Sequence, residues 1–169
     1  MSRLQLAVDQ LRLSRGYLLH LLSNVSDDDW FRMPVGLATH LGWQVGHVAI
    51  AHYNLLLDRL RGYRPEDDAL FPRTQYVEQF GRLSQPAEQT GQYPTPAEIR
   101  QTLATLHTQA LSEVGLLREE ELDEMNVSPK PHPIVTTKLS SILWCAQHEM
   151  LHAGQIGLVK RLLGAAPMW

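Results

Sequence analysis

The chain has 169 residues, a formal net charge of −3 and a hydrophobic fraction of 44%. These values suit one globular domain, expected to span residues 1–169, and exclude a disordered chain. Basic residues are scattered through a net acidic sequence, which argues against nucleic acid as the main partner because such binding depends on neutralising phosphates.

Targeting and redox features predict a cytoplasmic protein without a membrane partner. No stretch approaches the roughly 18 uninterrupted apolar residues of a membrane span. The N-terminal sequence MSRLQLAVDQLRLSRG carries charges throughout and lacks the apolar core of a secretory signal peptide. Cys145 is the single cysteine, so an intrachain disulfide is excluded, which fits a reducing compartment.

The first half of the chain predicts two long helices. Leucines at helical spacing indicate the first helix, from about Ser2 to Asn24, and Ser26 is suited to cap a short helical turn after it. A second helix is predicted from about Thr39 to Gly62, because glycine commonly ends a helix.

The second half predicts a long connection and two further helices. Residues 63–93 are rich in proline and glycine, with a short helix expected at Arg73–Phe80. The run TPAE from Thr95 has the pattern of a capping box and begins the third helix, which continues through Leu117. The fourth is expected from Thr137 to Leu163. The predicted fold is all-α, a four-helix bundle with a long connection between helices 2 and 3.

Two histidines on the fourth helix form the strongest local signal. His148, Glu149 and His152 belong to the sequence HEMLH. Residues four apart on a helix differ by about 40° around its axis, so both imidazoles project from one face. Two imidazole nitrogens at this spacing can reach one metal ion. The pair therefore predicts part of a metal site.

The same five residues match the HExxH signature of zinc proteases, in which Glu149 would be the catalytic general base. The 17 residues after His152 contain no Asp, Glu or His that could serve as a further ligand. Gln155 and Leu158 occupy the glycine and histidine positions of the longer protease signature. The protease interpretation is therefore disfavoured.

A third ligand has to come from upstream. His47 is the best candidate, because it lies in the middle of the second helix, at the depth where bundles build metal sites from facing helices. His52 lies about 140° around the same helix from His47, so one face does not present both. His107 and His20 are weaker alternatives.

Short motifs in three places carry a family resemblance. The run HAGQI from His152 and the run RLLG from Arg161 resemble the closing helix of the DinB/YfiT-like proteins, and GHVA from Gly46 resembles the histidine motif of their second helix. Helix order, the long middle connection and the overall length are also similar. The resemblance therefore covers nearly the whole chain.

The resemblance implies a four-helix bundle in which His47, His148 and His152 bind a metal ion, and it implies a homodimer. Characterised members of the family include bacillithiol- or mycothiol-dependent transferases and a maleylpyruvate isomerase, all of which use low-molecular-weight thiols.

Three imidazole ligands leave an open coordination position, as in catalytic metal sites. They suit zinc or nickel, with iron or manganese as alternatives. The leading hypothesis is metal-dependent S-transfer from a low-molecular-weight thiol to a small-molecule substrate. A metal-dependent hydrolase with Glu149 as base, and a non-enzymatic bundle that binds a metal or ligand, are the alternatives.

Overall fold

The computed structural model describes residues 1–88 and 90–166, and the predicted all-α class is confirmed over these residues. Their only extended pairing is an isolated antiparallel bridge between Met125 and Thr137. None of the described helices is both long enough and apolar enough to span a bilayer.

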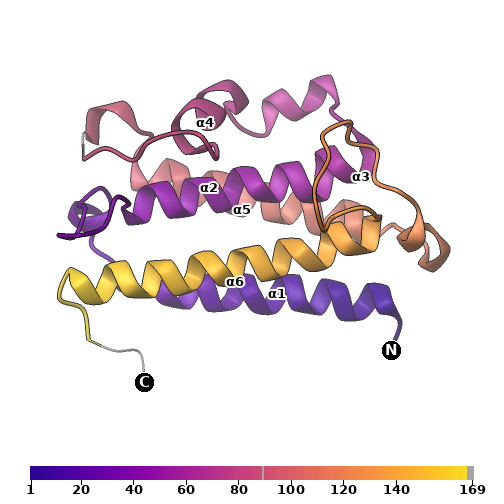
Figure 1. The fold of residues 1–169 in the computed structure, drawn as a ribbon, viewed down its shortest axis with the longest axis horizontal. Coiled ribbons are helices and arrows are strands. Elements are labelled where there is room, and N and C mark those ends of the chain that lie inside the picture. Colours follow the sequence, from indigo (N-terminus) through magenta and orange to yellow (C-terminus); the bar gives the residue numbers. More distant parts are fainter. Residues whose placement is uncertain (89, 167–169) are drawn as a thin grey trace.

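Four long helices run lengthwise beside one another (Figure 1). They are α1 (Arg3–Leu22), α2 (Leu41–Tyr53), α5 (Pro96–Val114) and α6 (Lys138–Leu162). Helix α6 packs against both α1 and α2, and α2 packs against both α5 and α6. The two helices on which the histidine signal falls are therefore direct neighbours.

Shorter helical segments fill the connections. They are η1 (Asp27–Asp29), η2 (Asn54–Asp58), α3 (Arg59–Arg61), η3 (Pro65–Ala69), α4 (Arg73–Phe80), η4 (Thr90–Gln92) and η5 (Glu119–Asp123). The predicted short helix in the long connection is α4, with the expected bounds, and it packs on the outer side of α2 (Figure 1).

Side-chain caps set where the long helices begin. Ser2 accepts a hydrogen bond from the backbone N–H of Gln5 at the start of α1, and Thr137 caps α6 in the same way. Thr95 and Glu98 form the predicted capping box of α5. Helix α2 begins at Leu41, slightly later than predicted, because the N-cap is His40 and not Thr39: the His40 imidazole accepts a hydrogen bond from the backbone N–H of Trp43.

The predicted second helix is continuous, but its hydrogen bonding changes along its length. Helix α2 passes directly into the π-helical segment η2 and then into the short α3. The run ends at Gly62, as predicted, where a φ of 85° favours glycine. The π-turns begin directly after Tyr53, so the α-helical register is kept through the region of His47.

A close approach at Gly46 joins α2 to the end of α4. A Cβ atom at Gly46 would lie 2.5 Å from the ring of Phe80, so only glycine fits there without a shift. Phe80 is fully buried. This contact fixes the C-terminal end of α4 against the part of α2 that carries His47.

We expect Gly46→Ala to lower the free energy of unfolding by about 1–3 kcal/mol, because the new methyl group overpacks against a fixed aromatic ring. Urea unfolding of the metal-free protein measures the change. Gly16→Ala is the matched control: it lies within α1 with no atom within 4 Å of the added Cβ. That variant should be unchanged or more stable by up to about 1 kcal/mol, and an equal loss in both would contradict the overpacking argument.

Candidate metal centre

Helices α2 and α6 bring the three predicted histidines to one point. His47 extends from α2, and His148 and His152 extend from consecutive turns of α6. One ring nitrogen of each lies within 4.8 Å of the corresponding atoms of the other two. This is the only such group of histidine, cysteine or acidic side chains among the residues described. The alternatives His107 and His20 do not belong to it.

The ring of His47 is held on two sides. Its Nδ1 lies 2.7 Å from the carbonyl oxygen of Phe80, so Nδ1–H donates to that oxygen and leaves Nε2 with its lone pair. The indole of Trp43, one turn earlier in α2, stacks on the imidazole with ring centroids 4.9 Å apart and planes 10° apart. The Gly46 contact with Phe80 therefore acts on the ring of His47 through the backbone of α4.

His152 is oriented by a side chain of the facing helix. Its Nδ1 lies 2.5 Å from Oε1 of Gln44, and its Nε2 lies 3.2 Å from Nε2 of His148. Two ring nitrogens at that distance share a single proton or point at a common cation. The geometry thus directs the Nε2 atoms of both α6 histidines toward the same small volume.

Burial keeps the three rings uncharged near neutral pH. His152 is 8% exposed, and His47 and His148 are half-buried. Desolvation lowers the pKa of His148 to about 4 and that of His152 to about 3, and it also lowers the pKa of His47. Neutral imidazole is the form that binds metals, so the site fits a divalent cation with nitrogen ligands.

Glu149 lies between the two histidines in sequence, but its side chain lies elsewhere in space. It is fully buried, and its Oε1 accepts a hydrogen bond of 2.6 Å from Nε of Arg15 in α1. Its Oε2 lies 3.1 Å from Nε2 of His52. Burial raises the pKa of Glu149, against the lowering effect of Arg15. Both carboxylate oxygens are thus turned toward Arg15 and His52.

Cys145 also points into this buried cluster. Its Sγ lies 3.6 Å from Nδ1 of His52, and the side chain is 2% exposed. Burial raises the pKa of the thiol well above its usual range, which disfavours the reactive thiolate. The cysteine, histidine and glutamate side chains thus lie in contact inside the core, where the thiol is closed to substrate.

Aromatic rings lie beside the histidine cluster. The indole of Trp144, one turn before His148, has its ring centroid 6.4 Å from that of His148, and His132 lies 6.0 Å beyond Trp144. His132 belongs to the proline-rich segment between η5 and α6. Trp43 and Trp144 are both half-buried. They provide apolar surface at the edge of the candidate site.

Sequence reasoning found the histidines but missed what orients them. Gln44 and the Phe80 carbonyl have no local signature, because each contacts a residue that is distant in the chain. The sequence does place Gln44 three residues before His47, on the same face of the predicted helix. That spacing does not indicate that Gln44 contacts His152.

Residues 10–156 match the model of a known family, described as the DinB superfamily. No curated protein matches the chain. The matched range includes His47, His148 and His152.

Replacing Glu149 by Gln should cost about 3–5 kcal/mol of unfolding free energy, because it leaves the Arg15 guanidinium buried without its counter-charge. Chemical denaturation at neutral pH measures the loss. Glu119→Gln serves as the control, since that carboxylate pairs with Arg3 at the surface, where both side chains are more than 40% exposed, and should cost less than about 1 kcal/mol. Equal stability of Glu149→Gln and the parent would contradict the ion-pair role.

Proposed function

Because the chain belongs to the DinB superfamily, we propose that His47, His148 and His152 together bind one divalent metal ion. We further propose that the loaded protein is an enzyme that acts on a small molecule with a low-molecular-weight thiol. Zinc or nickel is the proposed metal, with iron and manganese as the alternatives. The observation that carries the proposal is the convergence of three neutral imidazoles from two helices within 4.8 Å.

The charge of the ligand set favours an anionic partner. Three neutral histidines leave the full double positive charge of a divalent cation uncompensated, and no carboxylate joins their group among the residues described. Such a cation would act as a Lewis acid that lowers the pKa of a bound thiol. The thiol sulfur would then form a bond to an electrophilic carbon while the bond from that carbon to its leaving group breaks. The leaving group would depart with the bonding electron pair, and the thiol proton would go to solvent.

The chain's own residues would orient the reactants. Trp43 and Trp144 would supply apolar walls beside the histidines, suited to the carbon skeleton of a substrate. Glu149 is engaged by Arg15, so the proposal gives it no proton-transfer role at the metal. The buried Cys145 likewise takes no part, so the reacting thiol is supplied by a second molecule.

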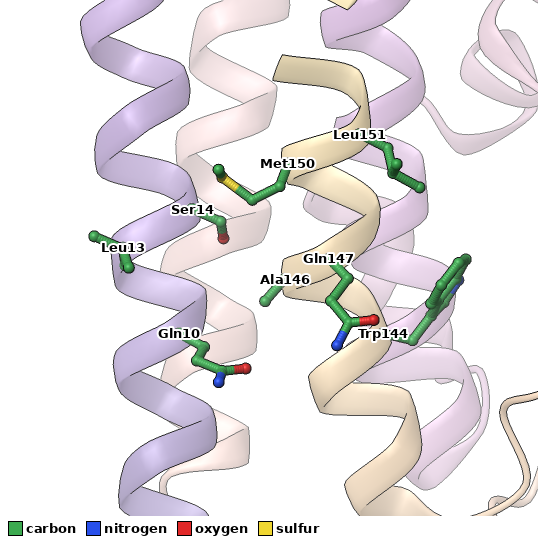
Figure 2. A pocket seen from close by; sticks show the side chains of 8 residues that line it. All are labelled: Gln10, Leu13, Ser14, Trp144, Ala146, Gln147, Met150 and Leu151. Atoms are coloured by element: carbon green, nitrogen blue, oxygen red, sulfur yellow. The ribbon is translucent and has the colours of Figure 1, made fainter. Parts of the chain in front are cut away.

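Two structural expectations accompany this function. The four long helices are proposed to form the four-helix bundle of the family, with the chain between Gly62 and Thr95 as its long connection. We also propose that two copies associate through α1 and α6. A groove of about 530 Å³ lies between these helices, and its lining carries no charged residue (Figure 2).

The α1–α6 face suits a second copy because it is apolar and exposed. Leu13 of α1 is 72% exposed, and Met150 and Leu151 of α6 are 44% and 58% exposed on the same groove. In Figure 2 Leu13 extends from α1, Met150 extends from α6 toward α1, and Leu151 lies on the far side of α6. A two-fold dimer would bring the same patch of both copies together. Leu158 and Leu162 continue the exposed apolar surface along α6.

Elemental analysis tests the metal site. We expect about one divalent metal ion per chain after loading with zinc or nickel and desalting, and a loss of stoichiometric binding in each of the three His→Ala variants. His20→Ala is the matched control, because His20 is an exposed histidine on α1 outside the cluster. A parent protein that takes up no metal after loading, or stoichiometric binding that survives in all three variants, would reject the site.

Turnover separates an enzyme from a binding protein. Loaded protein is mixed with cysteine or glutathione and an electrophile such as chlorodinitrobenzene, and the loss of free thiol is followed. Metal-dependent acceleration that disappears in His148→Ala supports S-transfer. Stoichiometric metal that stabilises the fold without any turnover over a panel of thiols and electrophiles would leave only the metal-binding half of the proposal.

The assembly is tested by light scattering after gel filtration. The parent should elute as a dimer, and the double variant Leu13→Glu, Met150→Glu should elute as a folded monomer, because two charges then face an apolar surface. Leu83→Glu is the control, a residue 91% exposed in the long connection. A dimer that resists the double substitution would place the interface on another face.

A further inference from the structure

We infer that Gln44 is the positioning residue of the candidate metal centre: its amide fixes the ring orientation and the tautomer of His152. This inference deepens the proposed function, since it rests on His152 being a metal ligand. Gln44 would not contact the metal. It would act through the hydrogen bond that it makes to the remote nitrogen of a ligand ring.

Gln44 is itself firmly held. Its side chain is 2% exposed, within the contact between α2 and α6. Its Nε2 donates a hydrogen bond of 2.8 Å to Oγ1 of Thr39, just before α2. An amide has one donor end and one acceptor end; with Nε2 bonded to Thr39, the acceptor Oε1 is the end that faces His152.

The direction of this amide determines where the proton of His152 lies. Oε1 is an acceptor only, so at 2.5 Å it requires the proton of His152 to reside on Nδ1. Nε2 then presents a lone pair toward His47 and His148. With the opposite tautomer, Nε2 would carry the proton and could not bind a metal, and two acceptors would face each other at Nδ1.

The contact also couples the two helices that supply the ligands. Gln44 lies three residues before His47, so α2 supplies both one ligand and the orienting group for the ligand on α6. The Phe80 carbonyl performs the corresponding task for His47. Because that acceptor is a backbone group, Gln44 is the orienting contact that a side-chain substitution can remove.

Three variants separate the hydrogen bond from packing. Gln44→Met keeps most of the volume but removes the acceptor. Gln44→Glu keeps an acceptor toward His152 and can accept from the hydroxyl of Thr39. Thr39→Val removes the group that orients the amide. Gln147→Met applies the same substitution to an exposed glutamine of α6 that lines the α1–α6 groove and not the histidine cluster, and it is the matched control for tautomer and metal affinity.

The first readout needs no metal. Long-range proton–nitrogen NMR of the metal-free protein, labelled at histidine, reports which nitrogen of each ring carries the proton. We expect the Nδ1–H form for His152 in the parent, in Gln44→Glu and in Gln147→Met, and a mixture of tautomers in Gln44→Met. The Nε2–H form in the parent would overturn the inference, whatever the protein does with metals.

The second readout is cobalt affinity, followed by visible absorption during titration with Co²⁺. Loss of an orienting partner of a metal-binding histidine typically costs 10–100-fold in affinity. We expect at least a tenfold loss in Gln44→Met, a smaller loss in Thr39→Val, and parental affinity in Gln44→Glu and Gln147→Met. An unchanged affinity in Gln44→Met, with its fold intact by circular dichroism, would overturn the inference.

The two readouts distinguish failure of this inference from failure of the proposed function. A parent that binds no cobalt but has the Nδ1–H form of His152, shifted by Gln44→Met, refutes the metal site and keeps the role of Gln44 in orienting the ring. If Gln44→Met does not fold, Thr39→Val and Gln44→Glu still decide. In that case the inference is overturned if Thr39→Val leaves the tautomer of His152 unchanged and Gln44→Glu loses its affinity for Co²⁺.

Discussion

The guanidinium of Arg15 is the constraint on which the arrangement of the long helices depends. From α1 it pairs with Glu149 of α6, donates to the carbonyl oxygen of Leu103 in α5 and approaches His52 of α2. Arg15 is 4% exposed and Glu149 is fully buried. A buried charge that loses its partner is costly, so any rotation of α6 that separated these groups would be strongly disfavoured.

The candidate metal centre inherits its geometry from this ion pair. Glu149 follows His148 directly, so fixing the direction of the carboxylate toward α1 also fixes the direction of the histidines around α6. Residues one and three positions away lie about 100° and 60° around the helix, which turns His148 and His152 toward α2. Gln44 then completes the orientation on the facing helix. The ion pair of Arg15 and Glu149 sets the rotation of α6 about its axis, and the hydrogen bond between Gln44 and His152 sets the orientation of the imidazole ring.

Local signals explain why part of this structure could be predicted from the sequence. The capping box at Thr95 depends on groups three residues apart, and the spacing of His148 and His152 requires only that their helix forms. The pairing of Arg15 with Glu149 joins residues 134 positions apart, and it gives the glutamate a structural partner that the HExxH pattern does not indicate. Periodicity carries no information about such a partner. The π-turns after Tyr53 had no local signal either, since they accommodate packing rather than follow from propensity.

The same ion pair affects what a metal at this centre can do. In an HExxH protease the glutamate faces the metal and accepts a proton from its water. Here both carboxylate oxygens are turned toward Arg15 and His52, and no carboxylate joins the three imidazoles among the residues that the structure describes. A divalent cation held there, as proposed, would favour an exogenous anion. The proposed thiol chemistry suits this arrangement, because the thiol supplies the anion and requires no water to be deprotonated.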